Sequence, residues 1–243
     1  MRVLRPVGFN SSTILSALST RVGGPAGSPF GMNLSFNVGD DPANVRANRD
    51  LFFKTLGIKE EEVAIPRQVH SSTVVRADHA GTYPECDGLV TDKTRVFLSV
   101  STADCIPIFI VEKEKKVVAA LHSGWRGTVA AIALEGVRKM VEEYGADPRA
   151  MSAYIGPAAS VCCYEVSQDV ASQFDRRFVR ELEGKLRVDL KGAVLDQLLS
   201  AGIPPASIDV NPLCTISESS LFHSFRRDGA KSGRMMGVIG VIR

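Results

Sequence analysis

Short runs of β-branched and aliphatic residues recur along the chain and predict a series of strands. The predicted strands are Thr73–Arg76, Asp87–Thr91, Val96–Ser101, Pro107–Val111, Val117–Leu121, Met151–Ile155, Ser207–Val210 and Met235–Ile242. The charged stretch Glu112–Lys116 separates two of these runs, which predicts a β-hairpin.

Fewer segments have the apolar spacing of a helix. They are Asp41 to Gly57, Thr128–Tyr144, Ser167–Phe178 and Leu190–Ser200. The first begins with a capping Asp and a Pro and ends at a Gly, as helices often do. Strands and helices mix without strict alternation, which favours one domain over residues 1–243 with an α/β fold: a layered sandwich of mixed β-sheets flanked by helices. A TIM barrel and a doubly wound sheet are disfavoured, and Gly23 to Gly31 is expected to be a surface loop.

Composition narrows the possible partners. The chain is 44% hydrophobic and 23% charged, with 29 basic and 27 acidic residues and a formal net charge of +2. So small a charge indicates neither a nucleic-acid nor a membrane partner. We expect no membrane span and no signal peptide, since no apolar run is long enough. The five cysteines are odd in number and thinly spread, which favours a reducing, cytoplasmic setting.

Three segments at predicted strand ends carry the residues best suited to chemistry. They are Arg67–His70, Ser101–Cys105 and Leu121–Gly127. Two of the four histidines and the single Trp lie in them. The third segment predicts a strand, a glycine turn and a helix, an arrangement that leaves backbone N–H groups free to bind an anion. Arg126 would add a cation suited to phosphate, although the glycines are also explained by a simple tight turn.

The spacing of His70, Cys105 and His122 is compatible with three different readings. Imidazole and thiolate are ligands that zinc prefers, and three protein ligands would leave a fourth position for water or substrate. Alternatively, Cys105 is a nucleophile with His122 or His70 as its base and Asp104 nearby. In the third reading all three are buried structural residues. Spacing alone does not decide among them.

The other histidines and cysteines are interpreted as structural. They are His79, Cys86, Cys162, Cys163, Cys214 and His223. A fourth ligand from His79 or Cys86 would close the metal site, but a polar loop would hold both poorly. The adjacent Cys162 and Cys163 are expected to be buried rather than to form a disulfide. The residues that follow His223 favour a turn over a substrate-lining loop.

Taken in order, a series of motifs from about Gly8 to the C-terminus resembles the YfiH/YlmD family, the bacterial laccase-domain or polyphenol oxidase group, which is similar to the catalytic domain of human FAMIN. The motifs are Asn33-Leu34, Val38–Asp41, Gln68–His70, Asp87–Thr91, Thr102–Pro107, His122–Gly127, Ile155–Pro157, Cys163–Val166 and Phe225–Gly229. The resemblance implies a single layered α/β domain, distantly like the catalytic domain of cytotoxic necrotizing factor. It also implies that His70, Cys105 and His122 bind a metal.

The activity implied by the resemblance is zinc-dependent phosphorolysis of purine nucleosides (adenosine, inosine, guanosine and methylthioadenosine) with accompanying adenosine deamination. The older family label implies a copper-dependent oxidase of phenols. Four histidines in the chain cannot supply the ligands of a multicopper laccase, although one copper ion at a site of two His and one Cys is reasonable. The motif of the zinc deaminases is missing. Asn37 stands where many family members carry His, which leaves specificity open.

The phosphorylase hypothesis assigns roles to further residues. Candidates for binding phosphate or nucleoside are Arg126, Ser123, Arg67, Gln68, Asn33 and Arg46. Asp87 or Asp104 would move a proton. The alternatives are a cysteine hydrolase or deamidase that uses Cys105 and His122, and a zinc-stabilised binding domain. The sequence leaves open whether the protein is a monomer or a weak dimer.

Overall fold

The computed structural model describes residues 1–243 except 7, 10, 25–26 and 28. The strands are β1 (Val3–Leu4), β2 (Ile14–Ser19), β3 (Val63–Pro66), β4 (Val74–Arg76), β5 (Gly81–Tyr83), β6 (Gly88–Thr91), β7 (Phe97–Thr102), β8 (Ile106–Glu112), β9 (Val117–Ser123), β10 (Met151–Ile155), β11 (Val179–Leu182), β12 (Lys185–Val188), β13 (Ile208–Val210) and β14 (Met235–Val241). The α-helices are α1 (Pro42–Leu56), α2 (Trp125–Val129), α3 (Ile132–Tyr144), α4 (Gln168–Ala171), α5 (Leu190–Ser200) and α6 (Phe225–Asp228).

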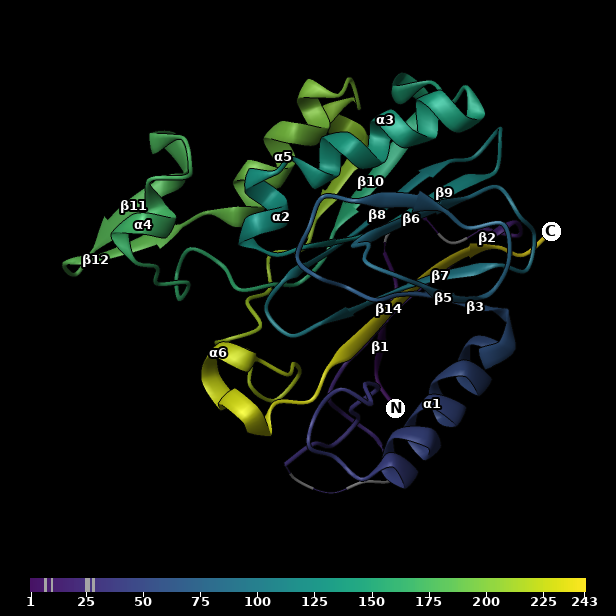
Figure 1. Ribbon diagram of the computed structural model, residues 1–243, viewed down its shortest axis with the longest axis horizontal. Helices are drawn as coiled ribbons and strands as arrows, with labels where there is room; N and C mark the ends of the chain where they lie inside the picture. The colour runs from purple at the N-terminus through teal and green to yellow at the C-terminus, as the bar shows by residue number, and fades with distance from the viewer. Residues whose placement is uncertain (7, 10, 25–26, 28) are drawn as a thin grey trace.

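Two six-stranded sheets stack face to face between helices (Figure 1). The first has the order β1-β2-β14-β7-β3-β5 and the second β13-β10-β8-β9-β6-β4. Both sheets are mixed. In the first, β7, β3 and β5 are parallel and the other pairs are antiparallel. In the second, β10, β8, β9 and β6 are antiparallel and the outer strands β13 and β4 pair in parallel. Helix α1 covers the outer face of the first sheet, and α3 and α5 cover that of the second. The predicted single-domain sandwich with mixed sheets is confirmed.

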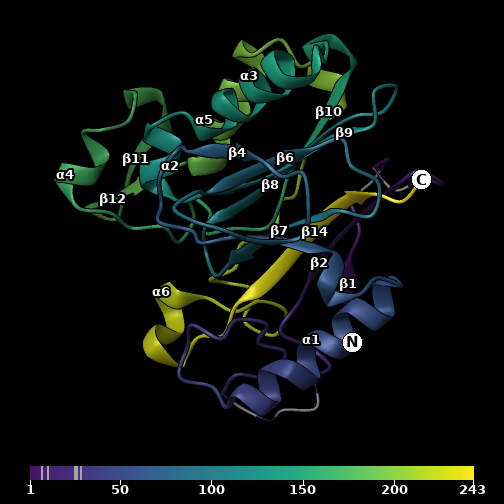
Figure 2. The same ribbon diagram turned by 45° about the vertical axis from the view of Figure 1, so that its right-hand side comes forward.

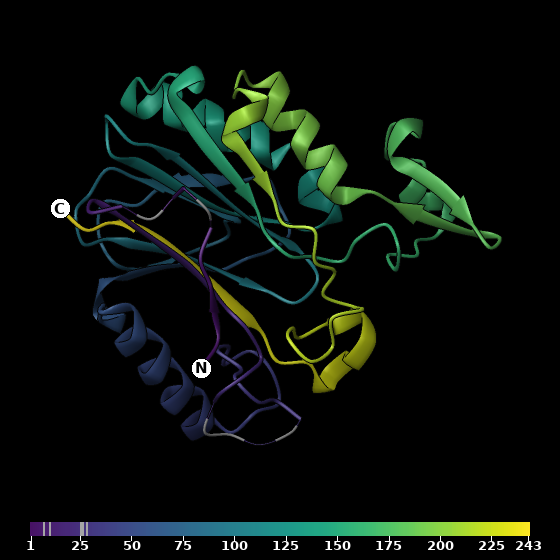
Figure 3. The same cartoon turned by 180° about the vertical axis from the view of Figure 1, so that it is seen from behind.

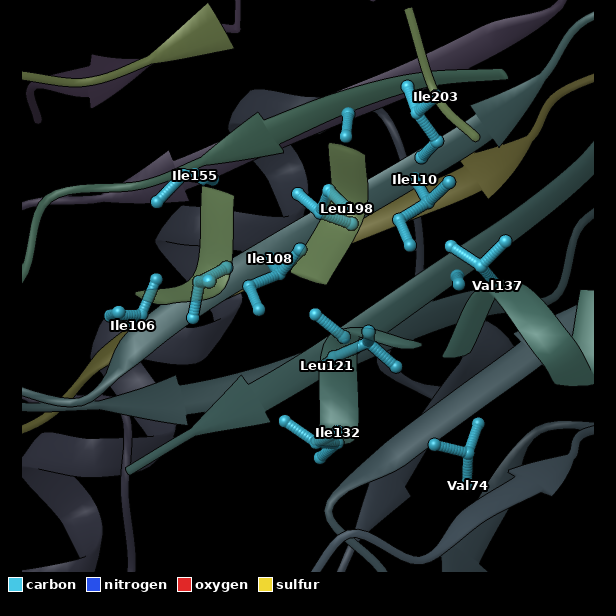
Figure 4. Packing of buried hydrophobic residues seen from close by; sticks show 14 of the residues in the cluster. Val74, Ile106, Ile108, Ile110, Leu121, Ile132, Val137, Ile155, Leu198 and Ile203 are labelled. Carbon is cyan, nitrogen blue, oxygen red and sulfur yellow. The ribbon is translucent and has the colours of Figure 1, made fainter. Parts of the chain in front are cut away.

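Apolar clusters fill each interface between the layers. The largest packs α3 and α5 on the second sheet, with Leu121 and Ile108 of the sheet against Val137 and Leu198 of the helices (Figure 4). A second cluster lies between the two sheets, and a third joins α1 to the first sheet. Because side chains alternate along a strand, the apolar residues of the inner strands feed both neighbouring layers, which explains their continuous hydrophobic sequence.

The predicted start and end of the first helix are confirmed. The Asp41 side chain accepts a hydrogen bond from the backbone N–H of Ala43 at 2.8 Å, Pro42 occupies the first turn, and Gly57 ends the helix with a left-handed φ of 72°. The predicted helix Leu190–Ser200 also has the observed bounds of α5. Both helices have the capping residues that define such ends.

The continuous helix predicted for Thr128–Tyr144 is wrong. The chain forms α2 and then α3, separated by Ala131 with a φ of 60°. The side chain of Gln197 on α5 donates to the carbonyl oxygen of Thr128 at 2.7 Å. The same carbonyl also accepts from the N–H of Ala131 at 3.0 Å, so Gln197 adds a tertiary contact at the break that local sequence does not reveal.

The helix predicted for Ser167–Phe178 is also wrong in extent, because α4 ends at Ala171 and a 3₁₀ turn follows at Arg176–Phe178. Asp175 caps this new turn by accepting from the N–H of Arg177 at 3.0 Å. Each of the eight predicted strands overlaps an observed strand, and β1, β2, β3, β5, β11 and β12 were not predicted. The β11–β12 hairpin and α4 project from the sandwich (Figure 3).

The predicted surface loop Gly23–Gly31 partly falls outside the described residues, and its described positions form no helix or strand. Among the described helices, none combines the length and apolar character that a membrane crossing requires.

Acid is expected to destabilise the fold through His223, which is wholly buried. Burial, then the charges of Arg21 and Arg234, lower the pKa of His223 from 6.5 to about 4. Between these values the unfolded chain binds the extra proton, so the free energy of unfolding falls as the pH drops. At pH 5 the loss is about 2 kcal/mol. Urea unfolding at pH 7 and pH 5 measures it. His223→Gln should remove this part of the pH dependence, and His79→Gln, at an exposed site, should retain it; equal slopes in both variants would contradict the assignment.

Candidate metal centre and active site

Three segments that are distant in sequence meet at one end of the second sheet. In the antiparallel register of β8 and β9, Pro107 lies opposite His122, so Cys105, two residues before Pro107, is brought near His122. Asp87 comes directly before β6, and its carbonyl accepts from the N–H of His122 at 2.7 Å. Strands β6, β8 and β9 lie beside one another in both views (Figures 1 and 2).

The loop after β3 brings His70 to the same place. Its backbone is held by the Asp87 carboxylate, which accepts from the N–H groups of Val69, His70 and Ser71 at 3.1, 2.9 and 2.7 Å. His70 itself has a φ of 61°, a conformation that is costly for a residue with a side chain. Such local strain persists where surrounding contacts fix it, and it is common at functional sites.

The donor atoms of His70, Cys105 and His122 all lie within 4.8 Å of one another. The two imidazole rings are 4.9 Å apart at their centroids and meet edge to face. Nδ1 of His122 is hydrogen-bonded to Asp87 at 2.8 Å, which leaves Nε2 for a ligand. A carboxylate behind a ligating imidazole is the usual outer support of a metal site. Two imidazoles and one thiol, with this support, therefore fit a metal ion bound by three protein ligands.

Charges inside the site favour a thiolate. Burial would raise the pKa of Cys105, but the charge and hydrogen bonds of His122 and His70 outweigh it and lower the pKa to about 6. Burial would likewise raise the pKa of Asp87, yet hydrogen bonds from His122 and Ser71 hold it at about 2. Cys105 and Asp87 in turn raise the pKa of His122 against its burial. A thiolate is the form in which cysteine binds metals and attacks electrophiles.

Gly124 keeps room beside the donor atoms. A Cβ at this position would lie 2.9 Å from Cδ2 of His70 and 3.1 Å from Sγ of Cys105. Any larger residue would therefore crowd the site, and this explains the glycine independently of turn geometry.

The site opens into a cavity of about 1010 Å³. Arginines stacked on aromatic rings form much of its wall. The distance from the guanidinium carbon to the ring centroid is 4.3 Å for Arg126 on Trp125, 5.0 Å for Arg226 on Tyr164 and 5.4 Å for Arg234 on Phe225. Within the part of the chain that the structure describes, none of these three guanidinium groups forms an ion pair with a carboxylate. The cavity thus offers positive charge and flat apolar surface together, which suits an anion and an aromatic ring.

Some of the predicted substrate-binding residues line this cavity and others do not. Arg67, Gln68, Arg126 and Asp104 line it. Asn33, Arg46 and Ser123 do not, so direct contact of these three with substrate in this cavity is not supported.

The three residues outside the cavity have structural contacts instead. The Asn33 amide donates to Asp40 at 3.0 Å and to the carbonyl of Ser35. The Ser123 hydroxyl is buried and hydrogen-bonded to Thr128 at 2.8 Å. Arg46 lies over the ring of Phe36.

Gln68 and Asp104 hold the walls of the cavity together. The Gln68 side chain donates to the carbonyl of Ser101 and accepts from its N–H, at 2.9 and 2.7 Å, which joins the loop after β3 to β7. The two Asp104 carboxylate oxygens accept from the Thr215 hydroxyl and from the backbone N–H of Arg226, each at 2.7 Å. Asp104 thereby ties Cys105 to the C-terminal part of the chain.

Sequence reasoning missed much of the cavity wall. The missed residues are Phe36, Arg49, Trp125, Tyr164, Phe225, Arg226 and Arg234. The residues after His223 form the one-turn helix α6, and Phe225 and Arg226 at its start also line the cavity. The pairs Trp125-Arg126 and Phe225-Arg226, each an aromatic residue beside an arginine, were the available signal. Asn37, the departure from the family pattern, also lines the cavity.

The remaining histidine and cysteines lie apart from this centre. His79 is exposed and stacks on Tyr83, and Cys86 is buried with its thiol directed at the carbonyl of Tyr83. The expectation that Cys162 is buried is wrong, because its side chain is exposed. Cys163 is partly exposed, and Cys214 is buried as expected.

Comparison with known proteins identifies the family. The family model described as "Multi-copper polyphenol oxidoreductase laccase" matches residues 15–242. A purine nucleoside phosphorylase of Deinococcus radiodurans is 39% identical over 93% of this chain and 89% of its own length. The purine nucleoside phosphorylase YlmD of Bacillus subtilis is 31% identical over 96% of this chain and 90% of its own length. The crystal structure of YlmD from Geobacillus stearothermophilus superposes with a TM-score of 0.90 at 33% identity, covering 96% of this chain and 93% of that one.

The fold and site define a mixed-sheet α/β protein with a His–Cys–His centre that can bind a metal. The chain belongs to the laccase-like YfiH/YlmD family. The word laccase in the family description is not matched by the ligands present, because a multicopper enzyme needs more histidines than the four in this sequence.

Proposed function

We propose that this protein is a metal-dependent purine nucleoside phosphorylase. The observation that carries the proposal is one cavity that combines the His70–Cys105–His122 centre with arginines that stack on aromatic rings and form no ion pair with a carboxylate among the described residues. The names of the relatives support the same reaction class. The substrates are a purine nucleoside (adenosine, inosine, guanosine or methylthioadenosine) and inorganic phosphate.

In this reaction a phosphate oxygen forms a bond to the anomeric carbon of the ribose, and the bond from that carbon to the purine nitrogen breaks. The bonding electrons leave with the base, which takes up a proton. The protein must therefore hold a dianion close to the ribose and stabilise positive charge that develops at the sugar. Arg126, Arg226 and Arg234 are assigned to the phosphate, with Arg67 at the exposed rim.

The aromatic residues are assigned to the base. Trp125, Tyr164 and Phe225 present ring faces in the cavity, and a purine ring stacks well on such surfaces. Phe36 and Asn37 lie on the cavity wall and are the candidates for selecting among purines. This assignment gives Asn37 a direct role in specificity.

The metal proposed for the centre is zinc, with copper as the alternative. When bound there, it would polarise a substrate oxygen or hold a reacting water. Asp87 orients His122, and Asp104 fixes the loop that carries Cys105, since both carboxylates are engaged in hydrogen bonds. We therefore assign both aspartates to positioning in place of the expected proton transfer. The proton for the base then comes from water or from another group at the cavity.

The proposal includes deamination of adenosine in the same cavity, in which water replaces the amino group at C6 and ammonia leaves. The cavity volume of about 1010 Å³ is ample for one nucleoside and phosphate.

The cysteines are unpaired, which supports the further proposal of a reducing, cytoplasmic location.

One observation favours a second candidate, a cysteine hydrolase or deamidase. Asp87, His122 and Cys105 are arranged in the order of a catalytic triad, with the carboxylate on Nδ1 of the imidazole and the thiol on its other side. This enzyme would need no phosphate and no metal, and His70 would have no essential role.

Phosphate binding through Arg126 is testable with a matched pair of arginines. Arg126→Ala is expected to raise the KM for phosphate about tenfold or more, because one charge-assisted contact contributes about 1.5–3 kcal/mol. Arg46→Ala, which alters an arginine outside the cavity, should change it less than about threefold. Release of base from inosine and adenosine, with and without phosphate, is the measurement. Base release that does not depend on phosphate would reject the phosphorylase and favour a hydrolase.

A further inference from the structure

A second group of thiols lies outside the cavity. Cys162 and Cys163 belong to the loop after β10, and Cys214 belongs to the loop after β13. The two loops are paired by a β-bridge between Ala158 and Cys214 and by the N–H of Thr215, which donates to the carbonyl of Ala158 at 3.1 Å. The three Sγ atoms all lie within 4.8 Å of one another. The loops after β10 and β13 thus place three sulfur atoms close together.

The surroundings of Cys214 suit a negatively charged sulfur. The N–H of Ser160 donates to its Sγ at 3.4 Å, and the N–H groups of Ile216 and Ser217 also point to it. Such a cradle of backbone N–H groups favours an anion.

Two cations lie beside this cluster. The buried ammonium of Lys191 donates to the carbonyls of Asn211 and Leu213 at 2.7 and 2.8 Å, directly before Cys214, and its charge acts on Cys214 and Cys162. Arg187 donates to the carbonyl of Cys162 at 2.5 Å. Arg187 is also paired with Glu165 and Glu183, so Lys191 is the cation that offsets part of the charge that several thiolates would carry.

The geometry points to metal binding over disulfide formation. The sulfur atoms of Cys162 and Cys163 are 3.3 Å apart and belong to adjacent residues, a pair that bridges poorly. A metal–sulfur bond of about 2.3 Å places two sulfurs on one tetrahedral ion about 3.8 Å apart. The 3.3 Å spacing lies slightly below this value and all three sulfurs lie within 4.8 Å of one another, so small rotations of the side chains suffice.

We propose that Cys162, Cys163 and Cys214 form a second metal site that takes a thiophilic cation, of the class of Zn²⁺, Cd²⁺ and Cu⁺, through three thiolates. Binding releases the thiol protons to solvent. The exposed side at Cys162 leaves the fourth position open to water or an external thiol. The site is separate from the His70–Cys105–His122 centre, and the proposal does not depend on the proposed function.

An ion at this site would brace the wall of the cavity. Cys163 is followed by Tyr164, which lines the cavity. Cys214 is followed by Thr215, whose hydroxyl donates to Asp104 beside Cys105. The thiol cluster therefore stands behind two elements of the active site, and a bound cation would hold both in place.

The test is a Cd²⁺ titration of the reduced, metal-free protein, followed by thiolate-to-metal charge-transfer absorption and by metal content. The wild type is expected to bind two ions. Cys105→Ala is expected to lose one and to keep one that still shows the thiolate band. In that background, Cys162→Ser or Cys214→Ser should weaken the remaining ion about tenfold or more, whereas Cys86→Ser should leave it unchanged.

Cys162 is exposed, so its variant is expected to fold even if Cys214→Ser does not. Retention of the second ion with unchanged affinity in Cys162→Ser would overturn the proposal. So would a thiolate band that is absent from the Cys105→Ala protein. Mass spectrometry of the reduced protein after exposure to air covers the remaining outcome: loss of two hydrogen atoms, their two electrons taken up by oxygen, with no uptake of Cd²⁺ would assign the cluster to a disulfide.

Discussion

Replacing Cys105 with Ala is expected to lower kcat/KM for phosphate-dependent nucleoside cleavage about 10³-fold or more and to remove the metal from the centre. The thiol is one of the three proposed protein ligands, and the two histidines alone would hold a metal weakly. Metal content and base release, measured on the same preparation, give both results. Activity that is unchanged in Cys105→Ala would reject the assignment of this centre.

The loss must be attributed to the site and not to the fold. Cys86→Ala is the matched control, because Cys86 is a buried cysteine outside both thiol-containing groups. It should keep activity and metal. An unfolding transition for Cys105→Ala near that of the metal-free wild type would show that the variant is folded.

His70→Gln separates the metal centre from the cysteine-nucleophile alternative. The side-chain arrangement Asp87–His122–Cys105 remains intact in this variant, so an enzyme that uses Cys105 as its nucleophile should retain most of its rate. A metal enzyme should lose activity together with its ion, since His70 supplies one of the three donors. Retained activity without metal would therefore favour the hydrolase.

The three ligands were candidates from sequence because the pattern of strand ends is local information. A histidine or cysteine directly after a buried run is visible in the sequence, and sheet edges gather such positions. The spacing left open whether the three side chains meet at one point. That depends on the β8–β9 register and on the loop after β3, whose backbone N–H groups are held by the Asp87 carboxylate. The family resemblance supplied that part.

The cavity wall was harder to predict for the same physical reason. Tyr164, Phe225 and Arg234 come from segments whose local patterns are those of loops, and only tertiary contacts bring them to the centre. Ser123 illustrates a second point, the direction of a side chain. A hydroxyl at the start of a glycine turn suits phosphate, but here a bond to Thr128 fixes it inside the helix start. Local sequence shows which groups are present and leaves their direction undetermined.

The helix errors have a related cause. The Thr128–Tyr144 pattern has a suitable apolar face throughout, yet the chain breaks at Ala131, where Gln197 reaches across from α5. In contrast, α1 and α5 were predicted well, because Asp41, Gly57 and Asp189 define their ends locally. Ends with strong local caps, such as those of α1 and α5, can be read from the sequence, whereas the break at Ala131 cannot.

Asp87→Asn is expected to weaken metal binding about 10–100-fold and to lower the free energy of unfolding by about 3–5 kcal/mol. The wholly buried Asp87 carboxylate accepts hydrogen bonds from His122 and from the backbone N–H groups of residues 69, 70 and 71.

An amide of the same size has a single acceptor oxygen, so its NH₂ group must face donors that the carboxylate satisfied. The loop that carries His70 would then lose its anchor, and the Nδ1 proton of His122 its charged partner. Chelator competition measures the affinity, and urea unfolding measures the stability. Asp78→Asn, which removes the charge of an exposed ion pair with Arg76, is the control and should leave both nearly unchanged. Equal results for the two variants would mean that Asp87 neither supports the ligands nor holds the loop. A loss of stability with full metal affinity would limit its role to the fold.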